Sequence, residues 1–201
     1  ALVYRLRVYG PDTKEVAAIY ARLGAAEFYD NNLANAQRYE DEAYKIVEKH
    51  PLDRTYFTAM TKTVELTAIL RHFERTEELQ KRLIEIKESR YDKSDPWVIS
   101  LKANLILFYN QFNKKDNAAL AVKGIVADLE KAKPDQRINC FPYLIVILTC
   151  CINSGWYDIA KPVAQLGQSI LSKDLGNVFP NEMIKNSWNQ ALERLQKHPA
   201  T

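Results

Sequence analysis

Residues 15–48, EVAAIYARLGAAEFYDNNLANAQRYEDEAYKIVE, contain two runs in which apolar side chains recur every three or four positions. This spacing is that of the apolar face of an amphipathic helix. Asp30, Asn31 and Asn32 interrupt the pattern between the two runs, and such residues favour turns over helix interiors. The stretch therefore predicts two antiparallel helices, which start near Glu15 and Leu33 and are joined by a short turn.

The same alternation of helical run and short break continues through the rest of the chain. No segment shows the strict apolar–polar alternation of a half-buried strand, and only six glycines and eight prolines occur. The first dozen residues are interpreted as the end of an earlier helix and its linker. We therefore predict an all-α fold, with further helices that start near Arg54, Thr76, Pro96, Asn117, Arg137, Tyr157 and Asn181.

An internal repeat groups these helices into pairs. Three residues return 82 positions later with the same identity, namely Tyr9, Val16 and Leu23 as Tyr91, Val98 and Leu105. Half of that shift, about 41 residues, is the length of two helices with their turns. We expect four helix pairs and a C-terminal capping helix, stacked as an α-α superhelix, or solenoid, of antiparallel hairpins. Residues 1–201 are interpreted as one such repeat domain and as a fragment of a longer protein.

Small residues at three- and four-residue spacing predict where the helices approach one another most closely. They are Ala36, Ala43, Ala160, Ala164 and Gly167. Trp188, with Ile184 and Leu192 four residues to either side, is expected to form the apolar stripe of the capping helix. Glu40 lies close to Ala36 in the sequence, and we expect its side chain to face water.

Several residues stand at the spacing of a known repeat signature. Leu23 and Gly24 are followed by an aromatic residue, an alanine, a second aromatic residue and a second alanine, which are Phe28, Ala36, Tyr39 and Ala43. Residues 155–160, Gly-Trp-Tyr-Asp-Ile-Ala, look like a turn of the same signature. The chain resembles the tetratricopeptide repeat (TPR) family, and its 41-residue period is similar to that of kinesin-light-chain repeats. The resemblance covers roughly residues 5–172 and is weakest in the second pair, where more than one register is possible.

This resemblance implies a concave groove in which the first helices of successive pairs hold a peptide. The residues that it places there are Arg22, Ala25, Tyr29, Asn104, Leu107, Gln111 and Thr149. Arg22 and Tyr29 are two helical turns apart and so share a face, and Asn104 and Gln111 stand 82 residues after them. On the corresponding face the fourth pair offers Ile145, Thr149 and Asn153. The alternative is that these side chains are merely solvated on an open surface.

Composition and motifs argue against other classes of protein. The net charge is only +3, from 28 basic and 25 acidic residues, so we expect no nucleic-acid partner. No phosphate-binding loop, no nucleophile motif and no metal-ligand spacing occurs, so we predict no enzyme activity, no cofactor and no metal. The longest nearly apolar run, residues 141–152, is too short for a membrane span. The odd number of cysteines, three, favours a reducing, cytoplasmic location.

The function predicted from these features is that of a scaffold or adaptor for a protein or peptide partner. A regulatory or sensory module of a larger signalling protein is the alternative. A neighbouring DNA-binding, kinase or protease domain in the full-length protein would favour that alternative. The sequence does not identify the partner or the oligomeric state.

Overall fold

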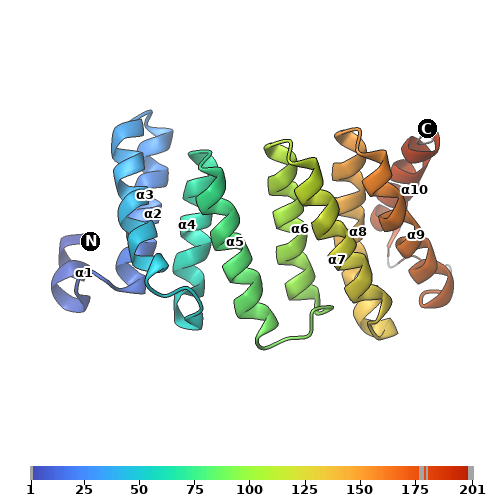
Figure 1. Ribbon diagram of the computed structural model, residues 1–201, viewed down its shortest axis with the longest axis horizontal. Helices are drawn as coiled ribbons and strands as arrows, with labels where there is room; N and C mark the ends of the chain where they lie inside the picture. The colour runs from blue at the N-terminus through green and yellow to red at the C-terminus, as the bar shows by residue number, and fades with distance from the viewer. Residues whose placement is uncertain (1, 177–178, 180, 199–201) are drawn as a thin grey trace. The chain divides into compact units, whose positions relative to one another are not determined.

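The computed structural model describes residues 2–176, 179 and 181–198. These residues form helices and turns with no β-strand, which confirms the predicted all-α fold (Figure 1). The chain divides into two compact units, residues 1–90 and 91–201. The described helices of the first unit are α1 (Leu2–Tyr9), α2 (Lys14–Tyr29), α3 (Leu33–Glu48), α4 (Phe57–Ile69) and α5 (Phe73–Glu88). Those of the second are α6 (Pro96–Gln111), α7 (Lys115–Glu130), α8 (Pro134–Asn153), α9 (Tyr157–Lys173) and α10 (Glu182–Gln196).

The observed helix starts lie within three residues of the predicted ones. Two of the differences have a local cause. Residues 54–56 form a short 3₁₀ turn before α4, so the predicted start at Arg54 marks that turn. Helix α8 begins at Pro134 rather than Arg137, because proline fits the first helical turn and Gln136 accepts a hydrogen bond from the Lys133 backbone N–H.

The helices pack as hairpins within each unit. In the first unit α2 packs against α3 and α4 against α5, and α2 also contacts α4. In the second unit α6 packs against α7 and α8 against α9. There the first helices α6 and α8 contact each other, as do the second helices α7 and α9. This pattern is that of a helical repeat, while the superhelical course of the whole chain, as one domain, stays a prediction.

All four hairpins turn in the same way. Each has one residue with positive φ: Asn31 (61°), Arg71 (61°), Asn113 (52°) and Gly155 (72°). In each turn the next residue donates its backbone N–H to a carbonyl five positions back, over 2.8–2.9 Å. These are the bonds of a Schellman motif, which closes the C-terminus of the first helix. The turn positions are 40, 42 and 42 residues apart, so the repeat period of about 41 residues is present in the backbone of every pair.

Helix α2 approaches its neighbours closely at Gly24. A Cβ atom on this residue would lie 2.5 Å from Leu66 Cδ2 of α4 and 3.2 Å from the Ala36 carbonyl oxygen of α3. Ala21, Ala43 and Leu66, one from each helix, form a buried cluster around this junction. The predicted small-residue face of the first hairpin is confirmed, since Ala36 and Ala43 are both fully buried.

Helix α10 covers the last hairpin, as predicted for a capping helix. It packs against α8 and α9. The Trp188 side chain is 1% exposed, and its ring lies 5.1 Å from the ring of Phe141, centroid to centroid. A Cβ atom on Gly167 of α9 would lie only 2.1 Å from Trp188 Cη2. Gly167 is therefore the surface on which the indole rests.

The expectation that Glu40 faces water is wrong. Its side chain on α3 is 0% exposed, because two residues at the start of α5 cover it. Arg75 donates to Glu40 Oε1 over 3.1 Å, and His72 Nδ1 lies 2.6 Å from Glu40 Oε2. Burying a lone carboxylate is costly, so the Arg75 guanidinium and the His72 imidazole are what allow Glu40 to lie between the helices.

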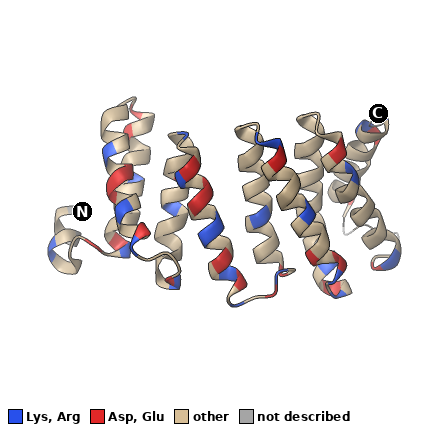
Figure 2. Cartoon of the chain, viewed as in Figure 1, with Lys and Arg blue, Asp and Glu red and all other residues tan. Residues whose placement is uncertain are grey.

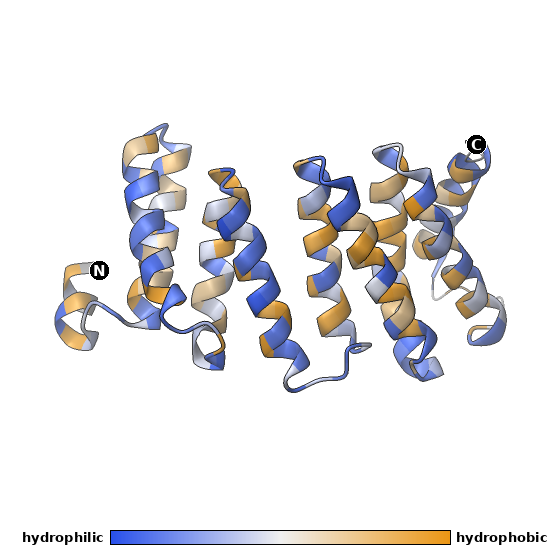
Figure 3. Cartoon of the chain, viewed as in Figure 1, coloured by the Kyte–Doolittle hydropathy of each residue, from blue (hydrophilic) through white to orange (hydrophobic). Residues whose placement is uncertain are grey.

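Further polar contacts extend this connection between α3 and α5. Arg75 also donates to Asp41 over 2.7 Å and lies over the ring of Tyr44. Tyr44 donates to Glu78, and burial together with this bond raises the pKa of Tyr44 to about 12. Acidic and basic residues accordingly alternate along α5 in Figure 2, and α3 and α5 show mainly hydrophilic residues in Figure 3. Charged and polar side chains thus join the second helices of this unit, α3 and α5.

The first prediction concerns the packing of Trp188 against Gly167. We expect Gly167→Ala to lower the free energy of unfolding by about 1–3 kcal/mol, because the added methyl group displaces a buried indole. Gly124→Ala is the control, since Gly124 lies inside α7 with open space around its Cα. Alanine should stabilise that helix by about 0.5–1 kcal/mol. Chemical denaturation measures both, and equal effects would contradict the packing described for α10.

The second prediction concerns the buried carboxylate. Glu40→Ala should destabilise the chain by about 1–3 kcal/mol, because Arg75 and His72 lose a partner in a partly buried setting. Glu42→Ala serves as the matched control. Glu42 is partly exposed and, among the described residues, pairs with Lys45, one turn away, so its loss should cost about 0.5 kcal/mol or less. Thermal unfolding of the two variants compares them directly, and equal losses would show that the buried pair adds nothing.

Candidate functional site

The positive-φ turn gives each first helix a common numbering. Counting back nine, six and two residues from the turn residue selects Arg22, Ala25 and Tyr29 on α2, and Asn104, Leu107 and Gln111 on α6. These are six of the seven residues predicted to line the groove, so the backbone itself shows that they occupy equivalent places. On each helix the three positions share one face.

The same count corrects the site residues predicted for the fourth pair and identifies the equivalent residues of the second pair. On α8 it selects Val146, Thr149 and Asn153. Val146 is 43% exposed whereas Ile145, which the sequence analysis placed on this face, is only 8% exposed. Ile145 therefore belongs to the core. Thr149 is half-buried, and Asn153 is exposed.

In the second pair the count selects Lys62, Glu65 and Ile69 on α4. Lys62 and Glu65 form an ion pair of 2.7 Å. Sequence reasoning missed these residues because the register of that pair was open. The Arg71 turn fixes the register, but arginine is an unusual residue at positive φ, so no sequence signal marked it.

Exposure separates the predicted site residues into two kinds. Arg22, Asn104 and Gln111 are exposed, as is Tyr29, whose exposed fraction is 73%. Ala25, Leu107 and Thr149 are half-buried between them. Arg22, Ala25 and Tyr29 belong to the first unit and the other four to the second. That all seven line one continuous groove stays a prediction.

Helix α6 carries the clearest row of candidate binding residues, namely Asn104, Leu107 and Gln111. Seven of its 16 residues are buried, and its lysine, Lys102, pairs with Asp128 of α7 over 2.7 Å. Asn104 and Gln111 stand on the remaining face with Leu107 between them. Within the described part of the chain, neither of these two amide side chains has a hydrogen-bond partner. An amide carries both donors and acceptors, so this face can donate hydrogen bonds to a peptide backbone and accept them from it.

A separate groove lies between the second helices α7 and α9. Its volume is about 410 Å³. It is mainly apolar, with charges at its rim, and Asp158, one of the residues that line it, forms an ion pair of 3.0 Å with Lys115 of α7. The residues that line it are Ala119, Val122, Lys123, Val126, Ala127, Glu130, Asp158, Ile159 and Pro162.

Sequence reasoning did not find this groove. The one available signal was Pro162, which lies inside α9. Proline has no N–H, so it cannot donate to the carbonyl of Asp158 one turn earlier. That carbonyl, at the rim, is left for another donor. The width of the groove depends on how far α7 and α9 stand apart, which no local pattern in the sequence reports.

The described residues offer no other obvious chemistry. No group of three or more His, Cys, Asp or Glu side chains among them could hold a metal ion. The three cysteines are free thiols, and burial raises the pKa of Cys140 and Cys151 to about 12. Such thiols are poor nucleophiles at neutral pH. None of the helices in the described ranges is long and apolar enough to span a bilayer.

The fold and these surfaces define a class, that of all-α proteins built from repeated antiparallel helical hairpins. Comparison with known protein families and with curated proteins finds no match to this chain. The resemblance to the TPR family therefore stays a prediction.

Proposed function

We propose that this chain is a protein-binding scaffold or adaptor that holds a segment of a partner protein along the exposed face of its first helices. The observation that carries the proposal is the row on α6. Asn104 and Gln111 are exposed amides without a partner among the described residues, and half-buried Leu107 lies between them. The rest of the helix supplies the contacts that α6 needs for folding.

The chemistry of this row suits an extended peptide. Amides 10 Å or so apart, as a seven-residue helical separation implies, can bond two carbonyl or N–H groups of one strand of chain. Leu107 offers an apolar contact between them. Because helices hold the row in place, little ordering is needed on binding, and this favours affinity.

The equivalent positions on the other first helices differ in character. Within the second unit α8 contributes Val146, Thr149 and Asn153, so that part is less charged. Within the first unit α2 contributes Arg22 and Tyr29, and α4 contributes the paired Lys62 and Glu65. The equivalent positions therefore offer amides and apolar groups in the second unit, and charge in the first unit. Membership of the TPR family, in its kinesin-light-chain-like form, is part of this proposal.

The third prediction tests the row on α6. The double variant Asn104→Ala/Gln111→Ala should lose the partners that the unaltered chain captures from a native lysate, as read by quantitative mass spectrometry. For a purified partner, each amide that leaves a buried ligand group unpaired should cost about 1–3 kcal/mol, or about tenfold or more in affinity. The melting temperature should not change, because neither amide has a hydrogen-bond partner among the residues that the structure describes.

Gln165→Ala is the matched control for this experiment. Gln165 is also an exposed amide, but it lies on α9, a second helix. This variant should capture the same proteins as the unaltered chain. If all three chains capture the same proteins with the same affinity, the row on α6 is not the binding site.

A further inference from the structure

The surface of α7 beside the groove is open and partly apolar. Leu120 is 73% exposed. Gly124 has open space where a side chain would stand, and Ala127 is half-buried on the groove wall. Small side chains of this kind let a second helix approach closely. The small side chains do not identify the helix that packs there, but the charged residues of α7 do.

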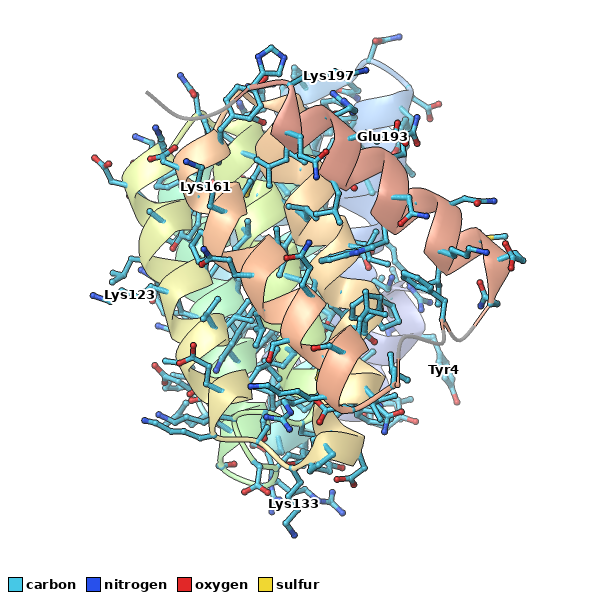
Figure 4. All side chains as sticks on the ribbon, turned by 90° about the vertical axis from the view of Figure 1, so that its right-hand side faces the viewer. Tyr4, Lys123, Lys133, Lys161, Glu193 and Lys197 are labelled. Carbon is cyan, nitrogen blue, oxygen red and sulfur yellow. The ribbon has the colours of Figure 1, made fainter. Side chains whose placement is uncertain are left out.

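Two charged side chains of α7 that line the groove have no ion-pair partner in the described part of the chain. They are Lys123 and Glu130, both exposed and both at the rim of the groove. Figure 4 shows the Lys123 side chain extending from α7 away from the other helices. The other charges near the groove are satisfied internally, since Lys115 pairs with Asp158 and Asp128 with Lys102.

These two charges are arranged so that α7 is complementary to itself. Lys123 and Glu130 are seven residues apart on one face, with Val126 and Ala127 midway between them. If a second α7 lies antiparallel across the first, with a two-fold axis beside Val126 and Ala127, each Lys123 meets a Glu130 of the other copy. Parallel alignment would instead place like charges together. Two-fold symmetry of this kind is the commonest in protein dimers.

We propose that the groove between α7 and α9 is a homodimer interface, in which α7 of a second copy of this chain lies antiparallel to α7. Val126 and Ala127 form the apolar centre, and two ion pairs between Lys123 and Glu130 set the register. The groove between α7 and α9 receives the second helix, so its apolar wall is covered in the dimer. The interface does not use the row on α6, so it stands or falls independently of the proposed function.

The fourth prediction follows from the symmetry. Sedimentation velocity at increasing concentration, in low salt, should show a monomer–dimer equilibrium. Lys123→Glu should weaken it at least tenfold, and so should Glu130→Lys, because each places like charges opposite one another at both ends. The double variant Lys123→Glu/Glu130→Lys should dimerise again. An equimolar mixture of the two single variants should form a heterodimer, since each then offers the charge that the other lacks.

Lys197→Glu is the control, because it makes the same change in charge at an exposed position immediately after α10 (Figure 4). It should leave the equilibrium unchanged, and circular dichroism should show that all variants remain folded. A chain that stays monomeric at every concentration would overturn the proposal and leave the groove to a different protein. A dimer that tolerates either single change, or that the charge exchange fails to restore, would place the interface elsewhere.

Discussion

The contact at Gly24 is the constraint on which the packing of the first unit depends. Three helices meet there, and the space between the α2 backbone, Leu66 of α4 and the Ala36 carbonyl of α3 is too small for a Cβ atom. A hairpin cannot bury its apolar face alone, so it must lie close to the next hairpin. Gly167 has the same role in the second unit, where it receives Trp188. Each unit thus contains a close packing contact that requires glycine, because a Cβ atom would not fit there.

The sequence predicts helices and close contacts well because both depend on local patterns. Apolar residues at three- and four-residue spacing placed every helix start within three residues, and alanines at the same spacing identified buried Ala36, Ala43 and Ala160. Glu40 was misplaced for the opposite reason. What buries it is His72 and Arg75 at the start of α5, more than thirty residues further on, and no helical pattern contains that information.

The candidate site also combines features that follow from local sequence patterns with features that depend on how the helices pack. The equivalence of Arg22 with Asn104 could be predicted because the repeat preserves sequence between the first and third pairs. On α8 the side chains are apolar almost all round, so the exposed face could not be separated from the buried one, and Ile145 was chosen in place of Val146. The groove between α7 and α9 is a property of the distance between two helices. It emerges only when the hairpins are stacked.

The turns also determine where this chain can change length. Each hairpin turn has three residues, and its positive-φ residue closes the helix before it. One residue added within α6 before Asn113 would rotate Asn104 and its neighbours by about 100° relative to the turn, which moves them off the exposed face. The connections from one hairpin to the next, such as residues 49–53, carry no such closure and can absorb an insertion without turning a helix. Length variation among natural relatives of this chain should therefore gather between hairpins and spare the turns within them.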